Sequence, residues 1–546
     1  MIDDPAVASG LSLDQIAELE AFGTRRAVVA GEYLYREGDA SYDFFVVLSG
    51  TIEAIAGSGS AERIVARHGA GRFLGELNLL TGLRVFVSAR VTEDGEVLVV
   101  PAAALREVIA TRPGLSDTIL AAFLARRSML LTDAAASIRV VGSRYCAESG
   151  RLLEFLQRAR VPHQWLDMDK EPAAEDLLRE FAVQATDLPV VIAGESVLRR
   201  PTTGELAEFL GLTVDFVIRH CFDLVVVGTG PAGLAAAVYG ASEGLSTLAV
   251  ESVAVGGQAG GSSRIENYLG FPTGISGGDL MHRALIQGEK FGAAFSLPCA
   301  AVGLSETNGH LTVHLSDDSQ IHARAVIAAT GARYRRLPAA GLAEFEDTSV
   351  FYAATEMEAK ACTPAPVVVV GGGNSAGQAA MFLAESGSPV TIVIRGEDLA
   401  ASMSRYLVAR IEQNPNIVLR TRTTVCALQG TLGLEHVVLA SPEGETKLPC
   451  QALFSFIGAD AGSDWLSGCA ALDDHGFVLT DRYLEPENLG AAWGLLGRAP
   501  LPFETSKPGL FAVGDLRSGS TKRVAAAVGE GSAAVRAVHE YLAFNR

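Results

Sequence analysis

The 546-residue sequence has seven cysteines but no two of them are spaced as Cys-x-x-Cys. They are scattered along the chain at Cys146, Cys221, Cys299, Cys362, Cys426, Cys450 and Cys469. An odd number of isolated thiols argues against a disulfide framework, and a zinc site would normally cluster its ligands. We therefore expect reduced thiols and no metal site.

Basic residues and long apolar runs are also scarce. The chain has 44 Lys and Arg against 63 Asp and Glu, for a net charge of −19. A nucleic-acid-binding protein needs a basic face, so we expect no nucleic-acid partner. No uninterrupted apolar stretch is long enough to span a bilayer, and residues 1–4 lack the basic and apolar regions of a signal peptide. We expect a cytoplasmic protein without a membrane span.

The length of the chain exceeds what one hydrophobic core supports, and predicts three or four domains. Residues 1–133 begin with a helix and continue with short strands at 44–48 and 51–55. Apolar residues then recur at helical spacing from Leu105 to Leu131. We expect a β-barrel flanked by helices in this part of the chain.

Residues 138–213 alternate between strand and helix patterns. Strands are expected at 138–142, 163–167 and 188–192, and helices at 152–160 and 173–181. This alternation predicts a small α/β layer. From residue 219 onward, a strand, a glycine-rich loop and a helix occur twice, which is typical of two Rossmann-type units. The fold class is therefore multidomain, with α/β and α+β parts.

The first glycine-rich loop follows the apolar strand 223–227 and has the spacing Gly-x-Gly-x-x-Gly. Its residues are Gly228, Gly230, Pro231, Ala232 and Gly233. Such glycines permit a tight turn and a close approach of the backbone to a pyrophosphate at a helix N-terminus. Glu251 ends the next strand, where a carboxylate accepts hydrogen bonds from an adenosine ribose. The pattern predicts a dinucleotide site.

The second glycine-rich loop predicts a nicotinamide dinucleotide site. It follows the strand 367–370 and contains Gly371, Gly373, Asn374 and Ser375. The next strand leads to Arg395, where a basic side chain can pair with a 2′-phosphate. NADPH is therefore favoured over NADH, although Glu397 and Asp398 follow closely and would oppose a phosphate.

The C-terminal part of the chain, from about residue 219, resembles the thioredoxin reductase-like class of pyridine nucleotide–disulfide oxidoreductases. Motifs spread over about 330 residues carry the resemblance: Gly256-Gly257-Gln258, Ile265-Glu266-Asn267-Tyr268, Ala329-Thr330-Gly331, Gly371-Gly372-Gly373-Asn374-Ser375-Ala376, Phe456-Ile457-Gly458 and Gly509-Leu510-Phe511-Ala512-Val513-Gly514-Asp515. The resemblance implies a non-covalent FAD, NADPH and a homodimer. It also implies an FAD domain in two parts, 219–336 and 459–546, around an NAD(P) domain at 337–458.

The same resemblance assigns further cofactor-binding residues. Gly257, Gln258 and Asn267 would line the flavin site together with Thr330 and Gly331. Gly514 and Asp515 would hold the ribityl and pyrophosphate portion. Arg523, Val524 and Ala525 would begin the helix near the isoalloxazine.

The working cysteines of that class are missing from their usual place before the second glycine-rich loop. Aligned on Val350, the two positions hold Ala353 and Glu356, and neither can form a thiolate. Cys362 is nearby but alone, and we interpret it as a buried small hydrophobic residue. The dithiol relay of the class is therefore absent from this position.

Residues 138–213 resemble a glutaredoxin or thioredoxin fold. Cys146 and Ser149 stand where that family carries its Cys-x-x-Cys or Cys-x-x-Ser, and Pro189 matches its cis-proline. Cys146 would then be a single-cysteine nucleophile at a helix N-terminus that forms mixed disulfides. The alternative is an adaptor domain whose cysteine is incidental, because Glu148 would raise the pKa of a nearby thiol.

Residues 1–133 resemble a cyclic nucleotide-binding β-barrel through the stretch 73–80. Glu76 would bind a ribose 2′-hydroxyl and the backbone of Gly75 would approach the ligand. The family's phosphate-binding arginine falls on Val85, and Arg84 is one residue short of that position. The alternative is a barrel that serves domain contacts or dimerisation.

Three functions follow from these patterns. The leading one is an NADPH-dependent flavoprotein reductase that passes electrons to a disulfide, through Cys146, or to another protein or small-molecule acceptor. The second is a ferredoxin- or quinone-type reductase or an oxidase, with the N-terminal domains as docking modules. The third is a redox sensor that responds to a nucleotide.

Overall fold

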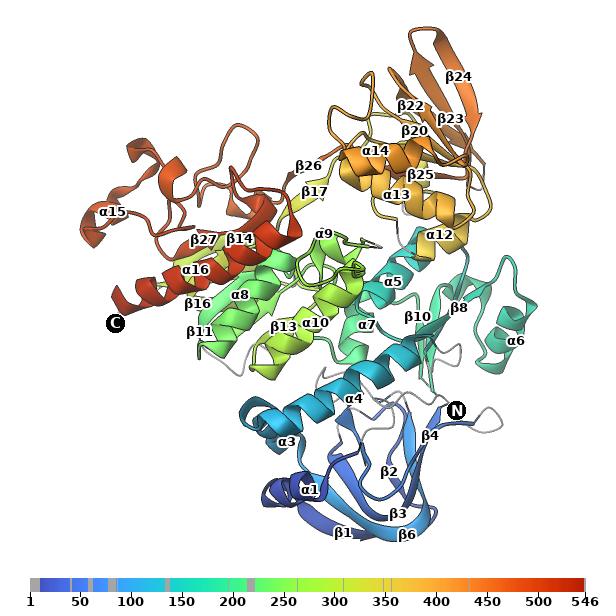
Figure 1. The fold of residues 1–546 in the computed structure, drawn as a ribbon, viewed down its shortest axis with the longest axis vertical. Coiled ribbons are helices and arrows are strands. Elements are labelled where there is room, and N and C mark those ends of the chain that lie inside the picture. The colour runs from blue at the N-terminus through green and yellow to red at the C-terminus, as the bar shows by residue number, and fades with distance from the viewer. Residues whose placement is uncertain are drawn as a thin grey trace.

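The computed structural model describes residues 10–39, 42–56, 62–76, 85, 87–132, 138–194, 196–213, 221–262, 264–307, 309–346, 348–354, 356–431 and 433–544. It contains four units, which we name the barrel unit, the middle unit, and the first and second dinucleotide units (Figure 1). The barrel unit lies at the bottom of that view and the second dinucleotide unit at the top. No single helix in the described ranges is long and apolar enough to cross a membrane, and the bent pair Ala102–Thr111 and Pro113–Arg127 meets that test only when taken together.

The barrel unit is an antiparallel sheet closed by helices. Its strands are β1 (Thr24–Val28), β2 (Tyr33–Tyr35), β3 (Phe44–Ala56), β4 (Arg63–His68), β5 (Phe73–Leu74) and β6 (Ser88–Val100), with the order β1-β6-β3-β4. The helices are α1 (Leu13–Leu19), α3 (Ala102–Thr111) and α4 (Pro113–Thr132). Helix α1 starts at a capping box formed by Ser12 and Gln15.

Two expectations for the barrel unit need correction. The strands expected at 44–48 and 51–55 form the single strand β3, because Gly50, with a φ of 85°, lies in an irregular stretch of the ladder rather than in a reversing turn. The helical pattern from Leu105 to Leu131 is divided into α3 and α4 at Pro113. A proline removes a backbone donor and disfavours the helical conformation of the residue before it, here Arg112.

The middle unit is a four-stranded mixed sheet with helices. It contains β7 (Ile138–Gly142), α5 (Ala147–Arg158), β8 (His163–Asp167), α6 (Pro172–Glu180), β9 (Val190–Ala193), β10 (Ser196–Arg199) and α7 (Thr203–Leu210). The strand order is β10-β9-β7-β8, and only β7 and β8 are parallel among the described pairs. Helix α5 begins five residues before the expected helix at 152–160.

The first dinucleotide unit has a sheet of seven strands. They are β11 (Phe222–Val227), β12 (Thr247–Val250), β13 (Ala294–Ser296), β14 (Ala301–Thr307), β15 (His310–Leu315), β16 (Gln320–Ala328) and β27 (Leu510–Ala512). The strands β11, β12, β13, β16 and β27 pair in parallel, whereas β14 and β15 add an antiparallel edge. The helices are α8 (Pro231–Ser242), α9 (Gly257–Gly260), α10 (Gly277–Lys290) and α16 (Val524–Phe544).

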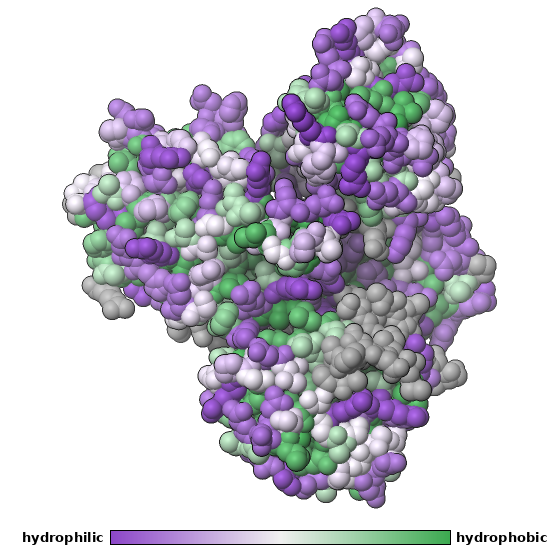
Figure 2. Space-filling view, in the orientation of Figure 1, coloured by the Kyte–Doolittle hydropathy of each residue, from purple (hydrophilic) through white to green (hydrophobic). Residues whose placement is uncertain are grey.

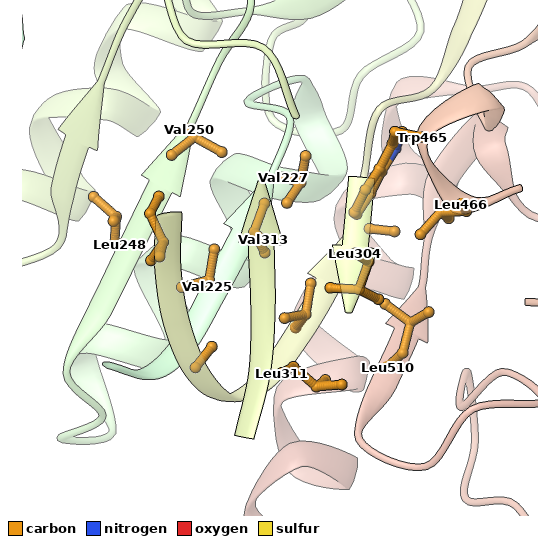
Figure 3. Close-up of a cluster of buried hydrophobic side chains, with 14 of the residues drawn as sticks. Val225, Val227, Leu248, Val250, Leu304, Leu311, Val313, Trp465, Leu466 and Leu510 are labelled. Carbon is orange, nitrogen blue, oxygen red and sulfur yellow. The ribbon is translucent and has the colours of Figure 1, made fainter. Parts of the chain in front are cut away.

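The core of this unit lies between the parallel strands and the antiparallel edge (Figure 3). Val225, Val227 and Val250 point toward Val313 and Leu304 across the layer. Trp465 and Leu466 close its outer side. Alternate β-branched residues on β11 therefore fill this core and leave the carboxyl end of the strand free for the glycine-rich loop.

The second dinucleotide unit is a parallel sheet with a small antiparallel sheet beside it. The parallel strands, in spatial order, are β18 (Val350–Phe351), β25 (Ala452–Ser455), β19 (Val367–Val370), β20 (Val390–Val393) and β21 (Ile417–Arg420). The antiparallel strands are β22 (Thr424–Gly430), β23 (Leu434–Ser441) and β24 (Gly444–Pro449), and the helices are α11 (Leu342–Phe345), α12 (Glu356–Cys362), α13 (Asn374–Glu385) and α14 (Arg405–Glu412). Two strands, β17 (Ala332–Tyr334) and β26 (Ala459–Ala461), pair antiparallel and connect the two dinucleotide units.

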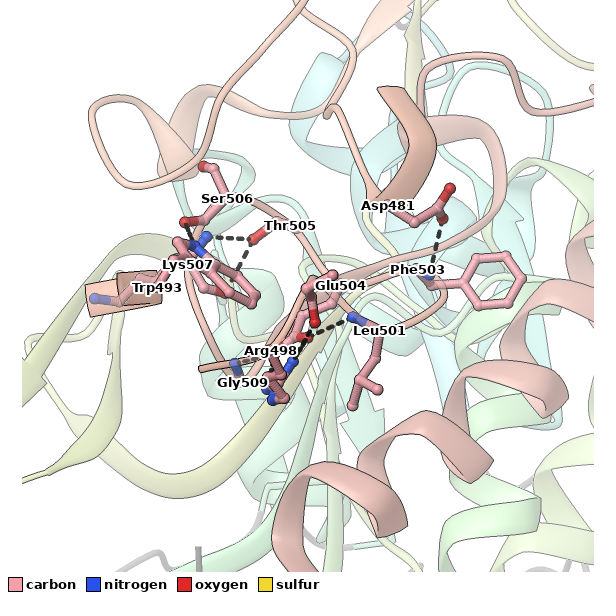
Figure 4. A network of polar contacts seen from close by, with 11 residues as sticks. Asp481, Trp493, Arg498, Leu501, Phe503, Glu504, Thr505, Ser506, Lys507 and Gly509 are labelled. Atoms are coloured by element: carbon pink, nitrogen blue, oxygen red, sulfur yellow. Dashed lines mark hydrogen bonds and ion pairs between the residues drawn. The ribbon is translucent and has the colours of Figure 1, made fainter. Parts of the chain in front are cut away.

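A segment near the C-terminus, which contains the short helix α15 (Ala491–Leu496), is held by a buried ion pair (Figure 4). Arg498 donates both Nη atoms to the carboxylate of Glu504, at 2.6 and 2.9 Å. The backbone N–H groups of Leu501 and Gly509 donate to the same carboxylate at 2.8 and 3.0 Å. Because the donors to this fully buried charge all lie within residues 498–509, the ion pair holds this segment in its conformation.

Candidate functional site

A cleft of about 2010 Å³ lies where the middle unit and both dinucleotide units meet. Figure 2 shows the surface hollowed between the upper lobe and the unit to its left. The cleft is lined by many of the residues that the sequence predicts: Gly228, Gly230, Pro231, Ala232, Glu251, Gly257, Gln258, Thr330, Gly331, Ser375, Gly514, Asp515, Arg523 and Val524. The predicted residues that do not line it are Gly233, Asn267, Gly371, Gly373, Asn374, Arg395, Ala525 and Cys146.

The first glycine-rich loop has no room for side chains. Gly228 has a φ of 99°, and a Cβ there would lie 2.5 Å from the carbonyl oxygen of Ala329. A Cβ on Gly257 would lie 2.9 Å from the Cα of Gly230. Helix α8 begins at Pro231, so its free N–H groups follow directly after the loop. This narrow backbone cradle at a helix N-terminus fits a pyrophosphate.

Glu251 lies at the rim of the same cleft, directly after β12. Its carboxylate accepts hydrogen bonds from the N–H and the hydroxyl of Thr229, both at 2.9 Å, and from the N–H of Ser252 at 2.9 Å. The side chain is 9% exposed. The hydroxyl of Ser252 and the N–H of Val253 also donate to this carboxylate, at 3.0 and 3.4 Å. Five donors therefore fix its orientation, and a ribose hydroxyl would have to displace or share one of them.

The far part of the cleft is built from the ends of β16 and β27 and the start of α16. Thr330 donates its hydroxyl to the carbonyl of Gly462 at 2.7 Å, which ties the strand end to the returning chain. Gly514, with a φ of 69°, has no space for a Cβ because Ala232 is 2.9 Å away. Burial raises the pKa of Asp515, while Lys522 acts in the opposite direction. The carboxyl group of Asp515 and the N-terminus of α16 thus face one cavity.

The second glycine-rich loop joins β19 to α13 and is more open. A Cβ on Gly371 would overlap the carbonyl oxygen of Phe456, whereas nothing lies within 4 Å of a Cβ on Gly373. Asn374 accepts a hydrogen bond from the N–H of Ser404 at 2.7 Å. Arg395 is exposed after β20, and the nearby Glu397 is paired with Arg422 at 2.7 Å. That ion pair weakens the repulsion that Glu397 would exert on a 2′-phosphate.

The stretch that lacks the cysteines lies against α9. Ala354 forms a β-bridge with Ser262, and a Cβ on Gly261 would lie 3.1 Å from that of Ala353. Both alanines line the cleft. Glu356 is the first residue of α12. The chain is therefore brought beside the flavin-site loop at this point, but it presents methyl groups there instead of a thiol.

Three of the other thiols are held in the protonated form. Burial raises the pKa of Cys299, Cys362 and Cys450 to about 12 in each case. For Cys362 the neighbouring Glu358 adds to this effect. These thiols are not poised for nucleophilic chemistry at neutral pH.

Cys146 is the N-cap residue of α5 and is half-buried. One side of α5, with Ser149, Leu153 and Gln157, lines the cleft, whereas Cys146 itself does not line it. The peptide bond before Pro189 is cis, as the resemblance to glutaredoxins implies.

In the barrel unit, the acidic side chain that the sequence singled out is already paired. Glu76, 1% exposed, accepts a hydrogen bond from Arg126 of α4 at 2.8 Å. Arg126 also donates to the carbonyl of Phe73 at 2.9 Å and lies over its ring. Gly75 has a φ of 104°, and a Cβ there would lie 2.8 Å from the carbonyl oxygen of Asp43. Arg84 lies outside the described residues.

Three contacts at these sites had no signal in the sequence. Arg126 comes from a helix 50 residues after Glu76. Arg158 of the middle unit reaches the loop after β12, about a hundred residues away. Tyr334 and Tyr352 stack at 5.7 Å between ring centroids beside Ala353. Their partners are set only by the packing of units, which no local pattern encodes.

Comparisons with known proteins agree with this geometry. The family model for pyridine nucleotide-disulphide oxidoreductases matches residues 222–531, and the model for cyclic nucleotide-binding domains matches residues 25–112. A thioredoxin reductase of Treponema pallidum is 32% identical over 324 residues, which are 59% of this chain and 97% of that protein. The NADPH-dependent thioredoxin reductase 3 of Arabidopsis thaliana is 31% identical and covers 64% of this chain and 66% of its own.

Solved structures give the same result. The thioredoxin reductase of Lactococcus lactis matches with a TM-score of 0.53 and 25% identity, over 59% of this chain and 99% of that one. That of T. acidophilum has a TM-score of 0.52 and 26% identity, over 59% and 99% of the two chains. Members of this group use FAD and NADPH. The chain therefore belongs to the pyridine nucleotide-disulphide oxidoreductases, as a thioredoxin reductase-like, NAD(P)H-dependent flavoprotein oxidoreductase with an N-terminal cyclic nucleotide-binding domain.

Proposed function

We propose that this enzyme transfers electrons from NADPH, through FAD, to an acceptor. It does so without the pair of cysteines that the class carries beside the flavin. The observation that carries the proposal is the position of Ala353, which lies beside Gly261, just after α9, at the place of the first cysteine of the class. The two glycine-rich loops are retained, so the reductive half of the chemistry has its binding sites. The oxidative half needs another route.

The residues of the first dinucleotide unit fit FAD. The loop from Gly228 to Gly233 would hold the pyrophosphate, Glu251 the adenosine ribose, and Asp515 the ribityl chain. FAD, when bound, accepts a hydride from a nicotinamide and returns electrons singly or in pairs. The chain itself would supply orientation: the starts of α8 and α16 line the cleft, and so do the stacked rings of Tyr334 and Tyr352.

The acceptor that the middle unit favours is a disulfide. The Cys146 thiolate would attack a substrate disulfide, R–S–S–R′, so that Cys146–S–S–R forms and R′–S⁻ leaves. Two electrons and two protons then convert Cys146–S–S–R to the Cys146 thiol and RSH, while NADPH becomes NADP⁺. The position of Cys146 at the N-cap of α5, a helix that lines the cleft, supports this route.

A steady-state assay distinguishes this route from the alternatives. Anaerobic NADPH is expected to bleach the flavin of the purified protein, and failure to do so would reject every enzymatic function. Oxidised thioredoxin, glutathione disulfide, oxygen, a quinone and a one-electron dye are then compared as acceptors. Cys146→Ser is expected to abolish disulfide reduction and to leave dye reduction intact, with Cys426→Ser, a half-buried thiol elsewhere, as the matched control. Undiminished disulfide reduction by Cys146→Ser would favour a ferredoxin- or quinone-type reductase or an oxidase.

We also propose that a cyclic nucleotide is a ligand of the barrel unit and that it competes with Arg126 for Glu76. The ion pair at 2.8 Å engages Oε1 of the carboxylate that would bind a ribose hydroxyl, and the buried Oε2 has no hydrogen-bond partner among the described residues. The variant Arg126→Met removes this competitor. It is therefore expected to raise the affinity for cAMP or cGMP, measured by calorimetry on the full chain. The absence of binding to both the native protein and the variant would support a barrel that serves only domain contacts.

A further inference from the structure

The middle unit is joined to the first dinucleotide unit by a shared hydrophobic core. Leu152, Phe155 and Leu156 of α5 belong to the same buried cluster as Val255 and Met281. Val524, the first residue of α16, packs against this cluster. A module that carried electrons by swinging away would have to expose this core, so the observed packing argues for a fixed wall of the cleft.

Polar contacts follow the same junction. Arg160, just after α5, pairs with Asp279 of α10 at 2.8 Å. The backbone carbonyl of Arg160 accepts a hydrogen bond from Arg127 of the barrel unit at 3.0 Å. Three units therefore meet at the C-terminal end of α5.

Arg158 is the residue of α5 that reaches the dinucleotide loop itself. One Nη atom donates to the carbonyls of Ala254 and Gly257, at 3.4 and 3.3 Å. The other Nη donates to Glu154, one helical turn earlier, at 3.3 Å. The two carbonyls flank the turn at Gly256, whose φ is 115°, and this turn leads into α9 beside the pyrophosphate loop.

The guanidinium of Arg158 also acts electrostatically on Tyr334, which lines the same cleft. Burial raises the pKa of Tyr334 to about 12, and the positive charge of Arg158 counteracts this effect. Asp515 is close enough to act on the same tyrosine. Arg158, Tyr334 and Asp515 all line the same cleft.

We propose that Arg158 is a positioning residue of the flavin site, supplied by the middle unit. It holds the carbonyls of the 254–257 loop so that the backbone cradle of Gly257 and Gly230 keeps its shape. It also adds a positive charge to the cleft, which stabilises the extra electron density of a reduced flavin relative to the oxidised form. This inference rests on the proposed FAD site.

The test compares Arg158→Met, Arg158→Lys and Arg179→Met in the full-length protein. Arg179 lies on α6, with its side chain 72% exposed, and serves as the matched control within the middle unit. FAD affinity is measured by adding FAD to the apoprotein, and the flavin midpoint potential by anaerobic dye equilibration. Neither readout requires turnover.

Arg158→Met is expected to weaken FAD binding about tenfold, because the donor that holds the two loop carbonyls is lost. It is also expected to shift the flavin potential to a more negative value, because the positive charge is lost. Arg158→Lys is expected to restore the potential more than the affinity, since it keeps the charge but not the fork. Arg179→Met should match the native protein in both. A purely structural role would lower the melting temperature without changing the potential, and that result would overturn the proposal. A native protein that does not bind FAD would instead overturn the proposed function.

Discussion

The first dinucleotide unit is joined to its neighbours in two different ways. Toward the barrel and middle units it shares buried apolar and charged contacts, including Arg127, His282 and Glu289. Toward the second dinucleotide unit it has the two-stranded connector, the bridge of Ser262 to Ala354, and an exposed ion pair of Arg410 with Glu266 at 3.9 Å. The middle unit is thus a fixed wall of the cleft, whereas the second dinucleotide unit is attached through a two-stranded connector that we expect to act as a hinge.

The largest expected effect comes from breaking the fixed side. Phe155→Ala removes a fully buried ring from the core shared by the middle and first dinucleotide units, which costs about 3–5 kcal/mol. We expect a lower melting temperature and release of FAD at a lower temperature, followed by flavin fluorescence. Leu177→Ala, in the separate core of the middle unit, should lower stability while leaving flavin release much less affected.

The junction of α10 with the barrel unit predicts a pH dependence. Burial raises the pKa of Glu289 to about 8, against the opposing charges of Arg127 and Arg106. Because the carboxyl ionises more easily in the unfolded chain, stability falls as pH rises from its unfolded pKa to about 8. Glu289→Gln should make this part of the melting-temperature profile flatter. The variant should lack at least about 1.4 kcal/mol of the pH-dependent loss in the free energy of unfolding.

The profile is measured between about pH 5 and pH 8 by thermal unfolding. Burial and the surrounding arginines lower the pKa of the neighbouring His282, so this group makes stability rise with pH up to about its unfolded value of 6.5 and opposes the effect of Glu289 there. Both proteins contain His282, so the difference between their two profiles reports on Glu289. Parallel profiles for the native protein and Glu289→Gln would contradict the prediction.

On the hinged side, a substitution should affect the nicotinamide nucleotide without changing the flavin. Arg395→Ala removes the exposed cation that follows β20, and we expect the KM for NADPH to rise about tenfold while that for NADH changes little. FAD content should stay as in the native protein. Equal changes for both nucleotides would show that Arg395 does not contact a 2′-phosphate.

The smallest effect is expected for the contact across the hinge. Arg410→Ala removes exposed ion pairs with Glu266 and Glu385, so stability should change by no more than about 0.5 kcal/mol. Denaturant unfolding of the full chain measures this change. A loss comparable to that of Phe155→Ala would mean that the second dinucleotide unit is as firmly fixed as the others.

Local patterns in the sequence were sufficient for the loops of the site but not for its contacts between units. Gly228 and Gly371 need conformations that favour glycine, so their spacing after apolar strands predicted both loops. The start of α5 was missed because its apolar pattern begins only at Leu152, whereas the first turn is polar and capped by Cys146. Arg126 and Arg158 find their partners through tertiary packing over 50 and about 100 residues, which leaves no periodic trace.

The connector has one more consequence. Tyr334 and Ala459 are directly opposite each other in β17 and β26, so the whole second dinucleotide unit enters and leaves the chain at one point. It is an insertion whose ends are neighbours, and a short turn could replace it without stretching the flanking strands. The flavin-binding remainder could then be prepared as a shortened protein, and the excised cassette exchanged for one of different nucleotide preference.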